Sequence, residues 1–135
     1  MIVAGEASGD LTGSELALCL KKIAPDLELS GIGGKRMKEA GVEILFDMTG
    51  FAVVGFTEVV RNLRRFKAVF RQFCRKMLEE KPMAIILLDY PGFNIRLAEK
   101  AKKNGITVIY YISPQTWAWG KSRVKKLAKL NQLLQ

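Results

Sequence analysis

The side chains best suited to acid–base chemistry stand in the segment DYPGFN, residues 89–94. Asp89 directly follows the aliphatic run at residues 84–88, so a strand would hold its carboxylate on a rigid support, and Asn94 offers both a hydrogen-bond donor and an acceptor. Such a carboxylate suits a general base that takes a proton from a substrate hydroxyl, a role that contributes about 10²- to 10⁴-fold in rate. The alternative is structural: Asp89 caps the next helix or braces the turn.

A second loop of small and polar residues, GEASGD, follows the first strand-like run. Glycines let a ligand approach the backbone, and free amides at a helix start favour an anion or a hydroxyl-rich group. The loop lacks GxGxxG and is no Walker A loop, so neither a dinucleotide nor a nucleotide triphosphate is indicated. The alternative is a tight strand-to-helix turn with a capping Ser or Asp. The candidate substrate-binding residues of this loop are Gly5, Glu6, Ser8, Gly9 and Asp10.

A third segment, SPQTWAWG at residues 113–120, adds Ser113 and Trp117 as substrate-binding candidates. Aromatic faces stack on sugar rings or cover an acyl chain. The alternative is that one or both tryptophans fill the core, which we favour for Trp119. The basic run that follows, at residues 121–129, is typical of a solvated helix face.

Strands that alternate with helices must position these three segments. Strand patterns occupy residues 1–4, 27–32, 42–46, 84–88 and 107–112. Helical patterns occupy the stretch that ends at Pro25, then residues 35–40, 56–78 with room for one break, and 95–103. This alternation predicts an α/β fold with a doubly wound, mainly parallel, Rossmann-like sheet. Because ligands bind beyond the carboxyl ends of such strands, the loops at Gly5, Asp89 and Ser113 should share one rim.

The composition fits one domain with anionic partners. The chain has 135 residues, 49% of them hydrophobic, and a formal net charge of +9. It has no histidine, and Cys19 and Cys74 each stand at an apolar position of a helical pattern. We therefore expect two buried free thiols, no metal site and no disulfide, as suits a reducing cytoplasm. No apolar run approaches the roughly 20 residues of a membrane span, and no signal peptide is expected.

The long helical pattern at residues 56–78 has an apolar stripe opposite a basic face. Its C-terminal half, with Phe70, Phe73 and Met77, should lie in the core. Its N-terminal half either packs likewise or lies on an anionic membrane, where each cation contributes about 1 kcal/mol. Nucleic acid is disfavoured as a partner, because the aromatics lie on the apolar stripe. The membrane-facing candidates are Phe56, Val59, Val60, Leu63, Arg61, Arg64 and Arg65.

Five segments, in order along the chain, resemble the lipid-A-disaccharide synthase family. They are GEASGD (5–10), GIGGKRM (31–37), VGFTEV (54–59), DYPGFN (89–94) and YISPQTWAW (111–119). The resemblance covers nearly the whole chain and implies the N-terminal, acceptor-side domain of a two-domain GT-B glycosyltransferase, spanning residues 1–135. Relatives often differ at Tyr90 and Gly92 and commonly have Ser-Val at residues 115–116, but neither departure removes a reactive group.

The resemblance implies a specific, inverting transfer. UDP-linked 2,3-diacylglucosamine would donate its sugar to 2,3-diacylglucosamine 1-phosphate, which gives the β-1,6-linked disaccharide of lipid A and releases UDP. Asp89 matches the position of the family's expected base for the acceptor 6-hydroxyl. No metal or other cofactor is expected, since the UDP-sugar is a substrate bound mainly by the C-terminal domain. Such greasy, anionic substrates imply a peripheral protein on the cytoplasmic face of the inner membrane.

Both ends of the chain look truncated, because it opens inside a strand pattern and closes on an apolar stretch without a terminator. We therefore expect the C-terminal nucleotide-sugar domain to be absent and the chain alone to be inactive. A homodimer is compatible with the sequence. Two other functions stay open: a non-catalytic basic α/β module that binds a membrane or an acidic partner, and another sugar-nucleotide enzyme of the same architecture.

Overall fold

The computed structural model describes residues 1–49 and 56–111, and of residues 56–62 it describes the backbone only. Five strands form one sheet in the order β3-β2-β1-β4-β5, and each neighbouring pair is parallel. The α/β, doubly wound, parallel architecture that the sequence predicts is therefore confirmed. The strands are β1 (Ile2–Val3), β2 (Ser30–Gly33), β3 (Glu43–Asp47), β4 (Ala84–Leu87) and β5 (Thr107–Tyr110).

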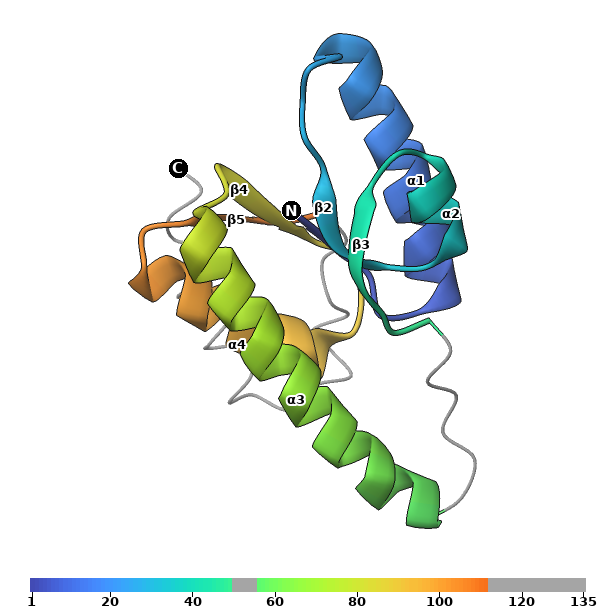
Figure 1. The fold of residues 1–135 in the computed structure, drawn as a ribbon, viewed down its shortest axis with the longest axis vertical. Helices are drawn as coiled ribbons and strands as arrows, with labels where there is room; N and C mark the ends of the chain where they lie inside the picture. The colour runs from blue at the N-terminus through green and yellow to red at the C-terminus, as the bar shows by residue number, and fades with distance from the viewer. Residues whose placement is uncertain (50–55, 112–135) are drawn as a thin grey trace.

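Helices cover both faces of this sheet (Figure 1). On one face lie α1 and α2, and on the other lie α3 and α4. In Figure 1 the N-terminal part of α3 projects past the sheet. The helices are α1 (Ala7–Ile23), α2 (Lys35–Glu39), α3 (Phe56–Glu80) and α4 (Pro91–Lys103).

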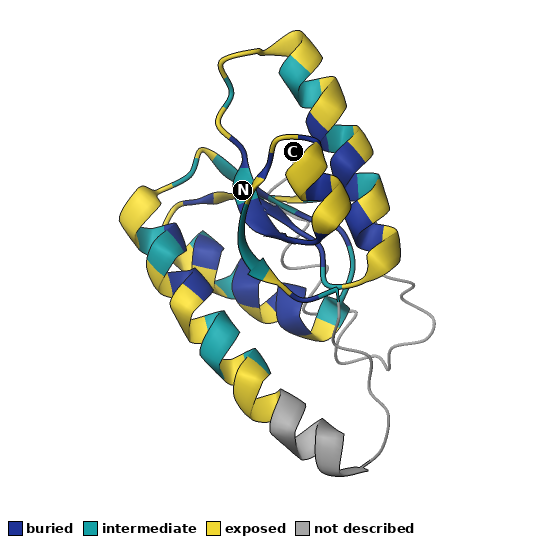
Figure 2. Ribbon diagram, turned by 45° about the vertical axis from the view of Figure 1, so that its right-hand side comes forward, coloured by how far each residue is buried: buried dark blue, intermediate teal, exposed yellow. Residues whose placement is uncertain are grey.

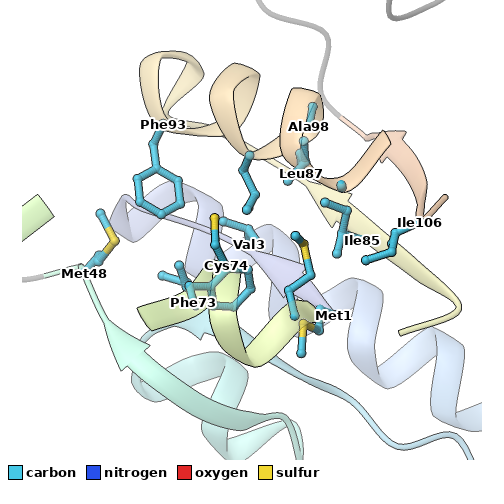
Figure 3. Packing of buried hydrophobic residues seen from close by; sticks show 14 residues of the cluster. Met1, Val3, Met48, Phe73, Cys74, Ile85, Leu87, Phe93, Ala98 and Ile106 are labelled. Carbon is cyan, nitrogen blue, oxygen red and sulfur yellow. The ribbon is translucent and has the colours of Figure 1, made fainter. Parts of the chain in front are cut away.

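The strands send alternate side chains into the two layers, as a period of two requires. On β1, Ile2 belongs to the hydrophobic cluster under α1 and α2, whereas Val3 belongs to the cluster under α3 and α4. Phe73 and Met77 of α3 are fully buried in the second cluster, as predicted for this half of the helix, and Figure 3 shows Phe73 among its neighbours. Phe70 is half-buried and packs against the same cluster.

The strand order reverses between β1 and β4, because the chain builds outward from β1 to β2 and β3 and then returns to the other side through α3. Loops at the carboxyl ends of β1 and β4 leave the sheet toward opposite faces at such a point and form a crevice. The loop that holds Gly5 and the loop that holds Asp89 are these two. The fold therefore places the strongest candidate residues at the topological switch point.

The buried face of α1 differs from the sequence expectation. The periodic residues Cys19 and Ile23 are exposed, so the prediction of a buried Cys19 is wrong. The fully buried positions of this helix, whose buried stripe is visible in Figure 2, are mostly small residues, and Leu16 and Leu20 pack half-buried against the same cluster. At Gly13 a Cβ would lie 2.7 Å from the Met37 sulfur and 3.0 Å from a Leu88 methyl, so a larger side chain would push the helix off its layer. The buried residues of α1 are Gly9, Asp10, Gly13, Ser14 and Ala17.

Helix boundaries also depart from the sequence reading at two starts. The first helix begins at Ala7, with Glu6 as its N-cap and no side-chain cap bond, so the alternative in which a Ser or Asp of this loop caps the helix is wrong. The fourth begins at Pro91, four residues earlier than expected, because proline is well suited to the first helical position. Glycines with left-handed backbones follow the ends of α2 and α4: Gly41 and Gly105 have φ values of 83° and 73°.

Candidate active site

The Asp89 carboxylate lies against the N-terminus of α1. Its Oδ1 accepts a hydrogen bond from the Gly5 N–H at 2.6 Å, and its Oδ2 accepts one from the Glu6 N–H at 3.0 Å. The two loops meet because β1 and β4 are neighbours in the sheet. The predicted shared rim is thereby confirmed for Gly5 and Asp89. Asp89 does not cap α4, whose N-cap is Tyr90 without a side-chain cap bond, so only the bracing part of the structural alternative agrees with the geometry.

Two glycines of the first loop leave space for the Asp89 loop. A Cβ at Gly9 would lie 1.9 Å from the Asp89 Oδ2, and a Cβ at Gly5 would lie 2.9 Å from the Tyr90 Cβ. Real Cβ atoms do not approach other heavy atoms so closely, so both positions require glycine while the carboxylate keeps its place. In the structure these glycines therefore lie directly against Asp89 and Tyr90 of the same chain. Their predicted contact with a substrate stays a prediction.

The environment of Asp89 makes its carboxylate a stronger base than an ordinary aspartate. Burial raises the pKa of Asp89 above its usual value, the N–H groups of Gly5 and Glu6 oppose this shift, and the nearby Glu6 carboxylate adds to it. The carboxylate is half-buried, so a ligand can reach it from solvent. Each oxygen keeps acceptor capacity beyond the one backbone bond that it accepts. This combination suits a general base at the mouth of a crevice.

The next residue, Tyr90, has an unusual backbone. Its φ of 51° and ψ of 63° are left-handed, a conformation that costs a residue with a Cβ roughly 1–2 kcal/mol. Its ring stacks on Phe66 of α3, with centroids 5.2 Å apart and an interplanar angle of 14°. Its carbonyl accepts hydrogen bonds from the N–H groups of Phe93 and Asn94 and so starts α4. Strain of this kind clusters at functional sites.

Asn94 lies beneath the loop and is 0% exposed. Its side-chain amide donates to the backbone carbonyl of Asp89, and its Oδ1 is buried with no hydrogen-bond partner within the part of the chain that is described. The side chain therefore supports the loop from below. Its predicted contact with a substrate stays a prediction.

Asp10 braces a different element. It is 5% exposed, and its carboxylate accepts hydrogen bonds from the N–H groups of Gly34, Arg36 and Met37 at 2.7, 3.0 and 3.1 Å. It therefore caps the N-terminus of α2 from across the layer. The Asp10 side chain also lines a hollow of about 420 Å³ at the rim, so the predicted contact of Asp10 with a substrate stays a prediction. The hollow is lined by Ala7, Asp10, Lys35, Arg36, Glu39 and Thr49.

Glu6 and Ser8 lie on the exposed side of the same rim. The side chain of the N-cap residue Glu6 makes no cap bond to the first turn of α1, and the Asp89 carboxylate accepts from the N–H groups of Gly5 and Glu6 just before that turn. Uncapped amides at a helix start suit an anionic or hydroxyl-rich group. Glu6 places a second carboxylate near Asp89.

Several predicted residues lie outside the described part. Ser113 and Trp117 fall within residues 112–135, and the side chains of Phe56, Val59, Val60 and Arg61 are likewise not described. Leu63 is 50% exposed, and Arg64 and Arg65 are exposed as well. Exposure is compatible with the predicted membrane surface, which stays a prediction.

Within residues 1–49 and 56–111, no group of three or more Cys, Asp or Glu side chains is arranged to hold a metal ion. In the same residues no helix is both long enough and apolar enough to cross a bilayer.

Comparison with known proteins gives one consistent family. The family model described as lipid-A-disaccharide synthetase matches residues 1–135. The lipid-A-disaccharide synthase of Trichlorobacter lovleyi is 50% identical over 130 residues, which cover 96% of this chain and 34% of the relative. The lipid-A-disaccharide synthase of Coxiella burnetii is 46% identical over 129 residues, with the same coverage of 96% and 34%. The chain thus spans about a third of the length of the curated relatives that it matches.

Proposed function

This chain belongs to the lipid-A-disaccharide synthetase family, and on that premise we propose that it is the acceptor-side domain of an inverting glycosyltransferase of lipid A biosynthesis. The reaction transfers 2,3-diacylglucosamine from its UDP derivative to 2,3-diacylglucosamine 1-phosphate and releases UDP. The observation that carries the proposal is the half-buried Asp89 carboxylate at the switch point, held by the N–H groups of Gly5 and Glu6. The names of the relatives support a role in lipid A biosynthesis.

The proposed chemistry is a single displacement. The acceptor 6-hydroxyl gives its proton to Asp89 while its oxygen forms a bond to the anomeric carbon of the donor. The bond from that carbon to the UDP oxygen breaks, and its electron pair leaves with UDP. Attack opposite the leaving group inverts the configuration at the anomeric carbon. Burial, which raises the pKa of Asp89, strengthens it as a base for this proton transfer.

The remaining parts of the proposal concern binding. The reaction uses no metal or other cofactor from this chain, and UDP is bound mainly by family residues outside it. Residues of the first rim loop, with Ser113 and Trp117, contact the acceptor sugar. The N-terminal half of α3 docks on an anionic bilayer at the cytoplasmic face of the inner membrane, where greasy substrates reside. The exposed Leu63, Arg64 and Arg65 support this orientation.

The test is Asp89→Asn in the natural protein that carries this chain. We expect kcat to fall by about 10²- to 10⁴-fold with KM changed little, because the amide cannot take the proton. Asp26→Asn, at an exposed turn far from the rim, serves as the matched control and should turn over like the wild type. Wild-type turnover in Asp89→Asn would remove Asp89 as the base.

A further inference from the structure

The stacked rings of Phe66 and Tyr90 connect α3 to the Asp89 loop. Phe66 lies on α3, and Tyr90 is the residue directly after the proposed base. Both rings are half-buried and pack on the cluster under α3 and α4. A parallel stack of this kind fixes both the distance and the tilt of the Tyr90 ring.

The backbone at Tyr90 is fixed from several sides. Its carbonyl is held by the first N–H groups of α4, and its Cβ side closes on Gly5, where an added methyl would come within 2.9 Å. The left-handed conformation is strained for tyrosine, so it persists only while such contacts hold it. The ring of Phe66 is the contact that comes from α3, the neighbouring helix of the same layer.

A shift of Tyr90 would move the base. The Asp89 carboxylate depends on the Gly5 and Glu6 N–H groups at 2.6 and 3.0 Å, and Tyr90 sits between Asp89 and the start of α4 while it touches Gly5. Release of the strained backbone would therefore turn Asp89 away from these amides. Misplacement of a reacting group by about 1 Å can lower a rate by about 10²-fold.

We propose that Phe66 and Tyr90 are a positioning pair, whose stacked rings hold the left-handed backbone at Tyr90 and thereby keep the Asp89 carboxylate in its reactive place. This inference rests on the proposed function, because it acts through Asp89. Neither ring needs to touch the substrate.

The experiment compares ring-deleting with ring-retaining variants in the natural protein that carries this chain. Phe66→Leu and Tyr90→Leu should each lower kcat by about tenfold or more and leave KM within about twofold, since binding groups are untouched. Phe66→Tyr and Tyr90→Phe should retain most of the turnover. The double variant should lose little beyond either single one, because both remove the same contact. Phe66→Met, which keeps volume without a ring, replaces Phe66→Leu where that variant is insoluble.

The matched control is Phe70→Leu, one helical turn further along α3. Phe70 is also half-buried and also makes a ring contact, but that contact is edge-on to Phe93 of α4, with centroids 5.3 Å apart. It should keep wild-type kcat. An equal loss of kcat in Phe70→Leu and Phe66→Leu would assign the effect to general packing and overturn the pair.

Asp89→Asn, assayed alongside, separates the two proposals. Loss of turnover in Asp89→Asn together with wild-type kcat in both ring-deleting variants would overturn the positioning pair and leave the base in place. Wild-type turnover in Asp89→Asn would overturn the base itself, whatever the ring variants show.

Discussion

Gly9→Ala is the sharpest perturbation of the rim that the structure offers. The added methyl would lie 1.9 Å from the Asp89 Oδ2 and 2.7 Å from its Cγ, so the carboxylate must move. Movement breaks its hydrogen bonds to the Gly5 and Glu6 N–H groups. The remaining close neighbour, the Ala4 Cβ at 3.2 Å, is tight but tolerable with a small shift.

The expected magnitude follows from the two lost bonds. Each hydrogen bond to a charged group contributes about 1.5–3 kcal/mol, and replacement of glycine by alanine in a helix returns up to about 1 kcal/mol, so the free energy of unfolding should fall by about 2–5 kcal/mol. Urea unfolding of the 135-residue chain, followed by far-UV circular dichroism, measures this change.

Two companions isolate the cause. Gly92→Ala is the matched control, because Gly92 also lies in a first helical turn and an added Cβ would meet nothing within 4 Å. It should change the free energy of unfolding by no more than about 1 kcal/mol, in the stabilising direction. In an Asp89→Ala background, Gly9→Ala should cost little, since the clashing carboxylate is gone. An equal loss of unfolding free energy from Gly9→Ala in both backgrounds would refute the claim that Gly9 leaves room for the Asp89 carboxylate.

Three further predictions concern the bracing, the thiols and the membrane surface. Asp10→Asn should lower the free energy of unfolding by about 1.5–3 kcal/mol in the same urea assay, because the amide loses the charge and one of the acceptor oxygens that hold α2; a stability equal to wild type would show that the cap contributes nothing. Iodoacetamide should label the exposed Cys19 well before the buried Cys74, because burial raises the pKa of Cys74 although the charge of Lys100 lowers it. Peptide mass spectrometry measures the order of labelling, and earlier labelling of Cys74 would contradict this prediction. Replacement of Val59, Val60 and Leu63 of α3 by Ser should lower co-sedimentation of the protein with anionic liposomes without unfolding it. Loss of folding instead would show that these side chains belong to the core.

Much of the fold could be predicted from pattern alone. An uninterrupted aliphatic run at residues 84–88 and strands that alternate with helices suffice for a parallel sheet, and the carboxyl-end rule then brings Gly5 and Asp89 to one rim. These inferences depend on local sequence and general topology, which is why they agree with the structure.

The details of the site depend on contacts between distant segments, which no local pattern encodes. Nothing near Gly9 in sequence indicates that its missing side chain makes room for Asp89. Likewise, Asp10 stands where a helix cap is expected for α1, but its carboxylate reaches the amides of α2. The expectation for Asp10 was wrong because a polar side chain near a turn was paired with its own helix.

The inward face of α1 shows a different limit. Hydrophobic periodicity detects large apolar residues, and Leu16 and Leu20 do pack on the cluster, but the closest approach is at Gly13, where Met37 and Leu88 leave no room for a side chain. The larger residue Ile23 is left 83% exposed at the end of the helix. The small residues Gly9, Gly13 and Ala17, spaced four apart, were the sequence signal that this helix approaches its neighbours closely.

The pH dependence of kcat tests the central claim most directly. Asp89 must be deprotonated to accept the proton, so turnover should rise as pH increases through its pKa, and burial places that rise above the range of an ordinary aspartate. We predict that kcat of the natural protein that carries this chain rises with pH in this way on the acid side of its pH profile. The Asp89→Asn variant should have little turnover and should not show this rise. The same rise at wild-type kcat in Asp89→Asn would contradict the assignment of Asp89 as the base.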